Sequence, residues 1–367
     1  MTRRILLAGG YGVVGAQAAA LLRKHHPEAE ILIGGRREKE AAALAASLGG
    51  AQAAVMDVTK PEPMRNLEGI DAVACFIHET DDHLLTEAAK RGIPYMDITR
   101  GQEAQMRGLA AAALLTPSAP MLFTSHWMAG GPAIVARRLA DGLDSVARVD
   151  MSILYYTGDK MGPDSASAGE GMAQGFTART GGAWRAVGPL SDEREVRFPS
   201  GTVRPVYRMN MGDVTTLALA NGARAAGVRL GLDKGNSLAT MRRLSGLGLW
   251  DLLRKLPGMS AIAATKPGKG AAHEIVIEVE GESGGRTISR RATILDREGQ
   301  SHLTAVGALY ALERIAGPGP SPLGPGAAPP ETAFTMAGFD RPAPPHPADG
   351  TPLRPQAVHA APPVAPP

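Results

Sequence analysis

A cluster of glycines near the start of the chain limits what its first part can fold into more than any other feature. The stretch RRILLAGGYGVVGAQAAALLRKHH contains a short apolar segment, then four glycines, then an alanine-rich helical pattern. The segment 5–8 predicts a buried strand, and 17–24 predicts a helix that follows the glycines without a break. Because the glycines interrupt the apolar run at once, a signal peptide is not expected.

These glycines fit a turn that binds the phosphates of a dinucleotide. One glycine allows the tight turn out of the strand, a second lets the backbone approach the pyrophosphate, and a third lets the helix pack closely on the strand. The N–H groups at the start of that helix then face the phosphates. The spacing alone is a weak signal, and the strand before it and the helix after it strengthen it. The residues expected to bind the cofactor are Gly9, Gly10, Tyr11, Gly12, Val13, Val14 and Gly15.

Strand and helix patterns alternate over the first third of the chain. Further strands are predicted within 29–37, 51–59, 70–79, 93–99 and 119–125. Such alternation predicts a parallel sheet with helices on both faces. The later part of the chain has longer strand-like segments, including a hairpin that turns at Glu282–Gly285. The expected fold class is therefore α/β, with an N-terminal doubly wound parallel sheet and a second α+β domain whose sheet is mostly antiparallel.

A chain of 367 residues with 44% hydrophobic residues is long enough for two domains. We expect a dinucleotide-binding domain at 1–125 and a domain at 126–300 that binds substrate and contributes to a homodimer. The helix predicted at 301–316 is expected to pack back on the first domain. The segment 340–367 is rich in proline and poor in residues that could form a core, so it is predicted to be disordered.

The end of the second strand discriminates between the two nicotinamide cofactors. An acidic residue there would bind the ribose hydroxyl of NAD, whereas arginine would accept the 2′-phosphate of NADP. The chain has Gly35, Arg36 and Arg37 at this point. Guanidinium groups suit bidentate phosphate binding, so NADP(H) is favoured over NAD(H). The alternative is that both arginines only solvate the start of a helix.

Two later strand ends complete the expected cofactor site. Asp57 and Val58 follow the third strand and could frame the adenine, or Asp57 could simply cap the end of the strand. Ile77 and His78 follow the fourth strand and are expected beside the nicotinamide, because ligands bind at the carboxyl edge of such sheets.

The chain also resembles a known family. The segments AGGYGVVG, GRR, AAKRGIPYMDITRGQE from Ala88 and GAAPPE from Gly326 look like the saccharopine dehydrogenase/reductase-like group. The resemblance extends to about Gly338 and implies a Rossmann NADP(H) domain joined to an α+β domain. Two elements depart from the group's pattern: Arg100–Glu103 intervene where it has Gly-Glu, and HWMAGGP stands at its Gly-x-x-Pro-Gly turn.

The leading interpretation is an NADP(H)-dependent oxidoreductase that transfers a hydride to or from a C=N, C=C or C=O bond of a small molecule. Such chemistry needs a group that donates or accepts a proton beside the nicotinamide. The strand ends offer Glu79 and Arg100 as neighbours of the site. His126, Asp97 and His78 are the predicted catalytic residues, each weighed against a structural role.

Three alternatives stay open. Tyr156 and Lys160 have the Tyr-x-x-x-Lys spacing of short-chain reductases, which works only on one face of a helix, and they follow a strand-like run. We interpret this pair as accidental, with a short-chain-type reductase as the alternative if a helix is found. The second alternative is a cofactor-binding accessory or sensor protein without turnover. The third alternative is association with a membrane through the amphipathic stretch 246–259, which could also be a lid or interface helix.

Composition excludes several other classes. The net charge of +3 is spread along the chain, so a nucleic-acid partner is not expected. No stretch is long and apolar enough for a membrane span. The nine histidines and single cysteine form no metal motif, and we expect no metal. Cys75 lies in an apolar run and is predicted to be a buried thiol, which suits the reducing cytoplasm.

Overall fold

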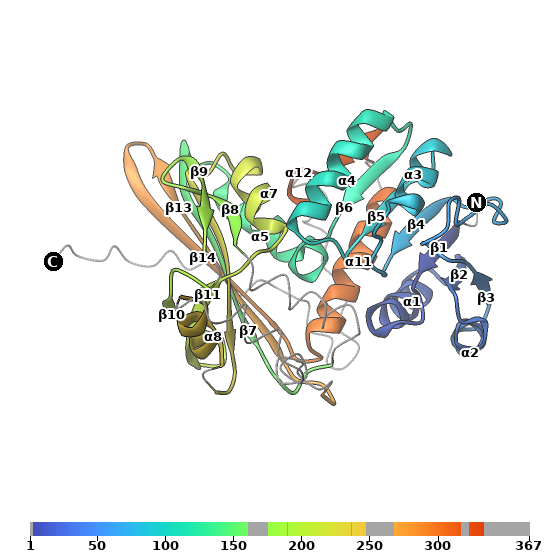
Figure 1. Ribbon diagram of the computed structural model, residues 1–367, viewed down its shortest axis with the longest axis horizontal. Coiled ribbons are helices and arrows are strands. Elements are labelled where there is room, and N and C mark those ends of the chain that lie inside the picture. Colours follow the sequence, from blue (N-terminus) through green and yellow to red (C-terminus); the bar gives the residue numbers. More distant parts are fainter. Residues whose placement is uncertain are drawn as a thin grey trace. The chain divides into compact units, whose positions relative to one another are not determined.

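The computed structural model describes residues 3–160, 175–188, 190–235, 237–246, 268–316 and 323–333 (Figure 1). Contacts divide the chain into two compact units. The first contains Met1–Gly131 and Glu298–Ala333, and the second contains Pro132–Asp159 and Gly169–Arg297. The helix at 301–316 is therefore part of the first unit. The predicted tail 340–367 and most of the amphipathic stretch, 247–259, lie outside the described residues.

The first unit is built on a parallel sheet. Every pair of neighbouring strands in it runs parallel. The order β3-β2-β1-β4-β5-β6 is that of a doubly wound dinucleotide-binding sheet, and β15 extends it beyond β6. In sheet order the strands are β15 (Gly326–Ala328), β6 (Pro120–Phe123), β5 (Tyr95–Asp97), β4 (Ala72–Cys75), β1 (Arg4–Ala8), β2 (Glu30–Gly35) and β3 (Ala51–Val55).

Helices cover both faces of this sheet. On one face α1 packs against α2 and α11, and α11 also contacts β4, β5 and β6. On the other face α3 packs against α4, and these two helices contact β5 and β6. The helices are α1 (Val13–His25), α2 (Glu38–Leu48), α3 (His83–Lys90), α4 (Gln102–Leu115), α11 (Gln300–Ala316), α12 (Pro330–Ala333) and the short 3-10 helix η1 (Trp127–Gly130).

The strands β1, β2, β4, β5 and β6 are buried on both faces along most of their length, as continuous apolar runs in parallel sheets are, whereas the edge strand β3 is largely exposed. Leu6, Leu7 and Ala8 of β1 have no exposed surface, and Cys75 at the end of β4 is equally buried. Burial raises the pKa of the Cys75 thiol well above its usual range. The prediction of a buried structural thiol is therefore confirmed.

The second unit is built on a mixed sheet. Its order is β10-β11-β12-β7-β13-β14, in which β12 and β7 run parallel and the other neighbours antiparallel. The predicted fold class is thus confirmed, with this one parallel pair as an addition. The strands are β7 (Ser145–Tyr155), β10 (Arg194–Arg197), β11 (Val203–Arg208), β12 (Ala225–Leu232), β13 (His273–Ser283) and β14 (Arg286–Asp296).

Smaller elements complete the second unit. The strands β13 and β14 form the predicted hairpin, and Gly284 and Gly285 make its turn with φ values of 57° and 73°, a backbone conformation that favours glycine. A second hairpin joins β8 and β9, and α7 packs against β8 and β12. The remaining elements are β8 (Phe176–Thr180), β9 (Ala183–Val187), α5 (Gly131–Ala140), α7 (Asp213–Ala220) and α8 (Ser237–Gly246).

No helix in the described ranges combines the length and the apolar character that a bilayer crossing needs.

Candidate functional site

The glycine turn connects β1 to α1 in the first unit. Gly9 has a φ of 79°, and its N–H donates to the carbonyl of Gly34 on β2 at 2.8 Å. The N–H of Gly10 donates to Leu7 at 2.9 Å, and that of Gly12 donates to Gly9 at 2.9 Å. These bonds fix a tight turn whose backbone is bonded both to β2 and within the turn itself.

The start of α1 lies directly against this turn. A Cβ atom at Gly15 would overlap the carbonyl oxygen of Gly9, so only glycine allows this approach. The N-cap position is Gly12, which has no side chain to bond the first N–H groups of the helix. The first N–H groups of a helix have no partner within it, and the helix dipole makes this end electropositive. The turn can therefore bind a phosphate through the backbone of 12–15.

The glycine turn lies where the strand order of the sheet reverses. β1 pairs with β2 on one side and with β4 on the other, and ligands of such sheets bind at this switch point. Ile77 follows β4 and approaches the turn so closely that a Cβ atom at Gly9 would lie 2.9 Å from its Cγ2. His78 comes next and is exposed. The structure thus brings the end of β4 beside the turn.

Tyr11 of the turn lies over the end of β2. A Cβ atom at Gly35 would overlap its ring, so the ring packs directly against the backbone of that glycine. Its hydroxyl accepts the N–H of Arg37 at 3.2 Å, and the Arg37 guanidinium carbon lies 5.0 Å from the ring centroid. Arg37 also pairs with Glu40 at 3.2 Å. Arg36 and Arg37 are both exposed at the strand end, where the sequence predicted them.

Asp57 and Val58 follow β3. The carboxylate of Asp57 accepts the N–H of Thr59 at 3.0 Å and its hydroxyl at 2.8 Å. These bonds to Thr59, together with nearby Arg36, hold the pKa of Asp57 below its usual value. Val58 is buried. Asp57 is therefore ionised and supports the loop after β3.

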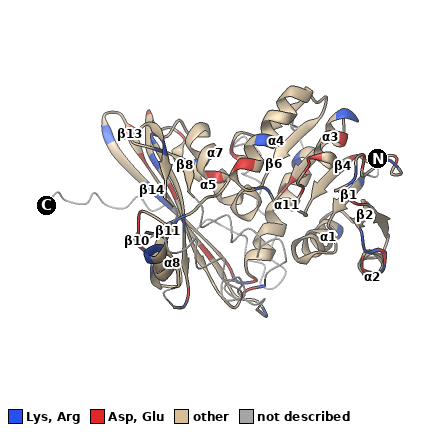
Figure 2. Cartoon of the chain, in the orientation of Figure 1, with Lys and Arg blue, Asp and Glu red and all other residues tan. Residues whose placement is uncertain are grey.

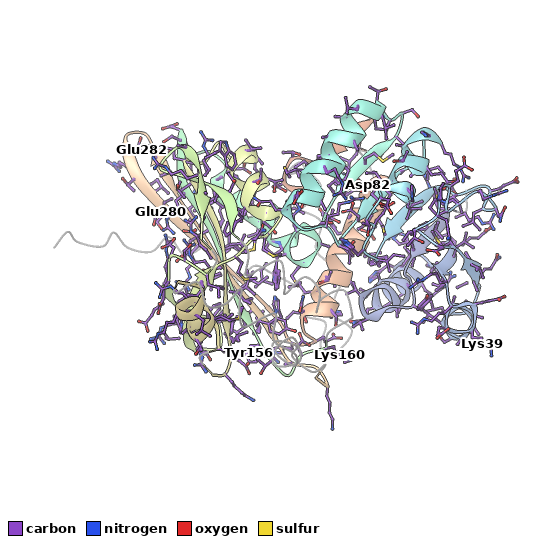
Figure 3. The ribbon with its side chains drawn as sticks, viewed as in Figure 1. Lys39, Asp82, Tyr156, Lys160, Glu280 and Glu282 are labelled. Atoms are coloured by element: carbon purple, nitrogen blue, oxygen red, sulfur yellow. The ribbon has the colours of Figure 1, made fainter. Side chains whose placement is uncertain are left out.

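A sealed network of charged groups lies at the carboxyl ends of β4 and β5. Arg100 donates to Glu79 at 3.0 Å, to Asp97 at 2.5 Å and to Asp82, which Figure 3 labels. The side chains of Arg100, Glu79 and Asp97 are each 1% exposed. Burial raises the pKa of Glu79. We name Arg100 with these three carboxylates the Arg100 cluster.

Neutral groups extend the Arg100 cluster to β6. The hydroxyl of Tyr95 donates to Glu79 or Asp97, with 3.2 Å to each, and Ser125 donates to Asp97. The N–H of Arg100 donates to the Ser125 hydroxyl at 2.9 Å. Asp97 is thus enclosed by hydrogen-bond donors and joins the ends of three strands.

His126 lies in a second buried cluster, just after β6. One ring nitrogen is 3.2 Å from the amide of Gln105 on α4, and the other is 3.3 Å from the carboxylate of Glu331 on α12. The side chains of His126 and Glu331 have no exposed surface. A carboxylate on one imidazole nitrogen fixes the orientation and tautomer of the ring.

The backbone after His126 adopts an uncommon conformation. Met128, Ala129 and Gly130 have φ values of 53°, 50° and 85°. A Cβ atom at Gly130 would overlap Pro330, and one at Gly307 of α11 would overlap the Met128 carbonyl. Two separate elements therefore hold this left-handed segment in place.

Tyr156 and Lys160 do not lie on a helix. Both follow β7 in turn and coil conformations (Figure 3). The Tyr156 hydroxyl donates to Glu274 at 2.6 Å, and burial together with this carboxylate raises its pKa. In a short-chain reductase the tyrosine and the lysine lie on the same face of a helix, and the pKa of the tyrosine is lowered. The interpretation of the pair as accidental is therefore supported by its geometry.

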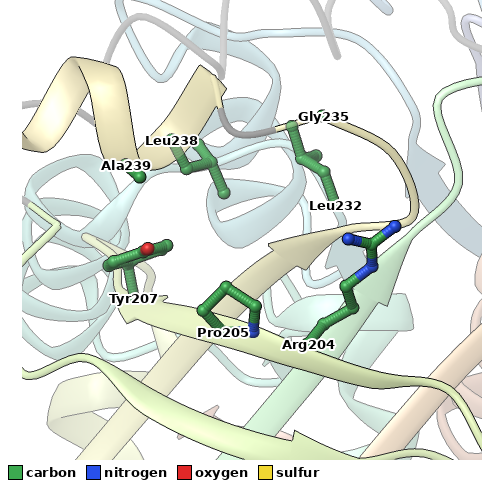
Figure 4. A pocket seen from close by; sticks show the side chains of 7 residues that line it. All are labelled: Arg204, Pro205, Tyr207, Leu232, Gly235, Leu238 and Ala239. Carbon is green, nitrogen blue, oxygen red and sulfur yellow. The ribbon is translucent and has the colours of Figure 1, made fainter.

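A small hollow lies in the second unit between β11, β12 and α8 (Figure 4). Arg204 is its charged lining residue, and its guanidinium donates to the carbonyl of Asp233. The remaining wall is largely apolar. The lining residues are Arg204, Pro205, Tyr207, Leu232, Gly235, Leu238 and Ala239.

Sequence reasoning missed the partners of His126 and one of the strands beside it. Glu331 was part of the segment GAAPPE but was given no role, and Gln105 was passed over. β15 places Glu331 next to β6, because Gly326–Ala328 pairs with Pro120–Leu122. A three-residue strand of glycine and alanine has no periodicity that could have predicted it.

No protein-family model matches the chain, and no curated protein matches its sequence. Among solved structures, saccharopine dehydrogenase (L-Glu forming) from Saccharomyces cerevisiae is similar with a TM-score of 0.63 and 13% identity, covering 89% of this chain and 94% of that one. Homospermidine synthase from Legionella pneumophila in complex with NAD gives a TM-score of 0.51 at 9% identity, covering 90% and 86%. These likenesses show that the chain has the saccharopine dehydrogenase-like fold.

Proposed function

We propose that the protein is an NADP(H)-dependent oxidoreductase that transfers a hydride to or from a C=N, C=C or C=O bond of a small molecule. The observation that carries this proposal is the glycine turn at the switch point of the sheet, with an uncapped helix start beside it. Two solved structures with this fold, a saccharopine dehydrogenase and a homospermidine synthase in complex with NAD, support a nicotinamide dinucleotide as the cofactor.

The preference for the 2′-phosphate rests on the end of β2. Gly35 is followed by Arg36 and Arg37, and no carboxylate stands at the strand end to accept a ribose hydroxyl. Both guanidinium groups are exposed and can reach an anion. Asp57 is ionised but bound by Thr59, so it acts on the loop rather than on the ribose.

For the proton transfer we propose different roles for the three candidates. His78 is exposed and follows β4 beside the turn, so its ring can exchange a proton with a bound substrate. Asp97 and His126 are enclosed by other side chains. They would act as positioning residues that hold the ends of β5 and β6 in place.

Binding titrations of the purified protein with NADPH and NADH test the cofactor. We expect NADPH to bind at least about tenfold more tightly, since a charged hydrogen bond contributes about 1.5–3 kcal/mol. Replacing Arg36 and Arg37 with alanine should abolish this difference while leaving NADH binding intact. Equal affinities for both cofactors in the native protein would disprove the NADP preference.

A screen of imines, enoyl thioesters and ketones with NADPH tests the chemistry. Loss of NADPH absorbance with one class identifies the bond that is reduced. His78→Asn should then lower kcat by about a hundredfold, whereas His83→Asn, on the neighbouring helix, should not. Tight NADPH binding without turnover of any class would favour the alternative of an accessory or sensor protein.

The same proposal includes a cytoplasmic homodimer. The mixed sheet of the second unit is the surface expected to form the contact. Sedimentation of the purified chain at micromolar concentration would show a single monomeric species if this part is wrong.

A further inference from the structure

The contacts around Arg37 point to a further property of the proposed cofactor site, and the inference rests on the function proposed above. We propose that Tyr11 and Glu40 set how strongly the site prefers a 2′-phosphorylated cofactor. Tyr11 holds Arg37 in a phosphate-binding position, and Glu40 competes with the phosphate for its guanidinium group.

Tyr11 connects the phosphate-binding turn to the end of β2. Its ring packs against Gly35, where any side chain would displace it. Its hydroxyl accepts the backbone N–H of Arg37, and its face lies under the guanidinium group at 5.0 Å. A cation over an aromatic ring at this distance is attracted to it. Tyr11 therefore fixes both the backbone and the side chain of Arg37 before a cofactor binds.

Glu40 forms an ion pair with the guanidinium group of Arg37, which a bound phosphate would need. It lies one turn after Arg37 at the start of α2, and its carboxylate is 3.2 Å from the Arg37 guanidinium. The start of a helix stabilises this negative charge. A 2′-phosphate must displace the carboxylate and is repelled by it. Arg36, in contrast, has no ion-pair partner within 4 Å among the described residues, so the two arginines start from different states.

The exposure of the pair limits the size of the effect. The side chains of Arg37 and Glu40 are 65% and 45% exposed, and such surface pairs contribute roughly 0–1 kcal/mol. Removing the carboxylate also removes its repulsion of a dianionic phosphate. We therefore expect Glu40→Gln to tighten NADPH binding about threefold to tenfold and to leave NADH binding within about twofold.

Glu38 provides a matched control. It lies in the same first turn of α2, is exposed and carries the same charge, and no ion pair joins it to Arg37. Glu38→Gln removes the same net charge from the same helix. Long-range electrostatics would affect both variants alike, whereas direct competition would affect Glu40→Gln alone.

The experiment measures the affinity of the full chain and of its Glu40→Gln, Glu38→Gln and Tyr11→Phe variants for NADPH, NADH, adenosine 2′,5′-bisphosphate and 5′-AMP. The expected result is tighter binding of the two 2′-phosphorylated ligands by Glu40→Gln only. Tyr11→Phe keeps the ring but loses the acceptor, and should weaken those two ligands about threefold to tenfold.

Two results would overturn the inference, and only the second of them also disproves the proposed function. If the native chain binds NADPH and adenosine 2′,5′-bisphosphate but Glu40→Gln behaves like Glu38→Gln, the competition by Glu40 is disproved and the proposed function stands. If the native chain binds none of the four ligands, both fail together. Folding of each variant is verified by its thermal unfolding, so that loss of structure cannot imitate either result.

Discussion

The two units of the molecule each bury charged side chains beside their sheet, but in opposite proportions. In the first, one arginine serves three carboxylates in the Arg100 cluster. In the second, four arginines surround Asp150 and Asp192 (Figure 2 shows the charged positions). We name the latter group the Asp150 cluster; its arginines are Arg148, Arg194, Arg208 and Arg229.

The clusters also differ in how they meet solvent. The first lies at strand ends and is sealed, with Arg100 1% exposed. The second lies across neighbouring strands and opens outward: Asp150 is 2% exposed, whereas Arg194 and Asp192 are 35% and 37% exposed. A sealed cluster depends on its buried cation, here Arg100, because a buried charge without a partner is costly. An open cluster can replace a lost partner with water or ions.

The largest expected effect is that of Arg100→Met. This change leaves Glu79 and Asp97 without their cation in a buried site, whereas Asp82 keeps its ion pair with Arg107. We expect the free energy of unfolding to fall by about 3–5 kcal/mol, measured by urea denaturation at neutral pH. Because protonation would neutralise the stranded carboxylates, the difference from the native protein should shrink as the pH is lowered.

Arg107→Met is the control for this prediction. Arg107 pairs with Asp82 at 2.8 Å, but its side chain is 48% exposed. An exposed pair contributes roughly 0–1 kcal/mol, so this variant should be nearly as stable as the native chain. Equal losses for the two variants would contradict the view that sealing makes Arg100 essential.

Asp150→Asn should have a smaller effect. Asp150 binds Arg148, Arg194 and Arg229, but Arg148 also binds Glu280, and Arg229 also binds Asp192. We expect a loss of about 2–3 kcal/mol, because the arginines keep other partners. Added sulfate should restore part of this stability by binding the arginines, and should not restore Arg100→Met. If sulfate restores the stability of both variants, or of neither, the distinction between an open and a sealed cluster is wrong.

The first unit was the more predictable of the two because its signals are local. The glycines at 9–15 and the apolar strand 5–8 lie within a dozen residues, and each carries its own structural reason. Once the glycine turn and the first strand are placed, the second strand is the next apolar segment, and Arg36 and Arg37 come directly after it. The hairpin β13–β14 was also predicted, since its glycine turn and alternating strands are adjacent in the sequence.

The clusters could not be predicted, because they depend on contacts between distant residues. Asp97 and Arg100 were recognised as candidates, but nothing in the sequence indicated that Arg100 would bind Glu79 and Asp82, 21 and 18 positions earlier. His126 and Glu331 are brought together by the short strand β15. The parallel pairing of β12 with β7 likewise joins segments with no common sequence signal.

The smallest expected effect concerns the pH response of the second unit. His273 begins β13 and has no exposed surface, and burial lowers its pKa to about 4 from 6.5, against a smaller opposing effect of Asp296. The unfolded chain therefore takes up a proton near pH 6.5 that the folded chain refuses until about pH 4. The free energy of unfolding should fall by about 2 kcal/mol as the pH decreases from about 7 to 5.

Hydrogen exchange of the β13 amides measures this loss, and His273→Gln should remove most of it. Glu79 in the first unit acts in the opposite direction: burial raises its pKa, so its contribution to stability increases as the pH falls. His83→Gln is the control and should lose as much stability on acidification as the native chain. If His273→Gln also loses as much as the native chain, another group makes this unit sensitive to acid.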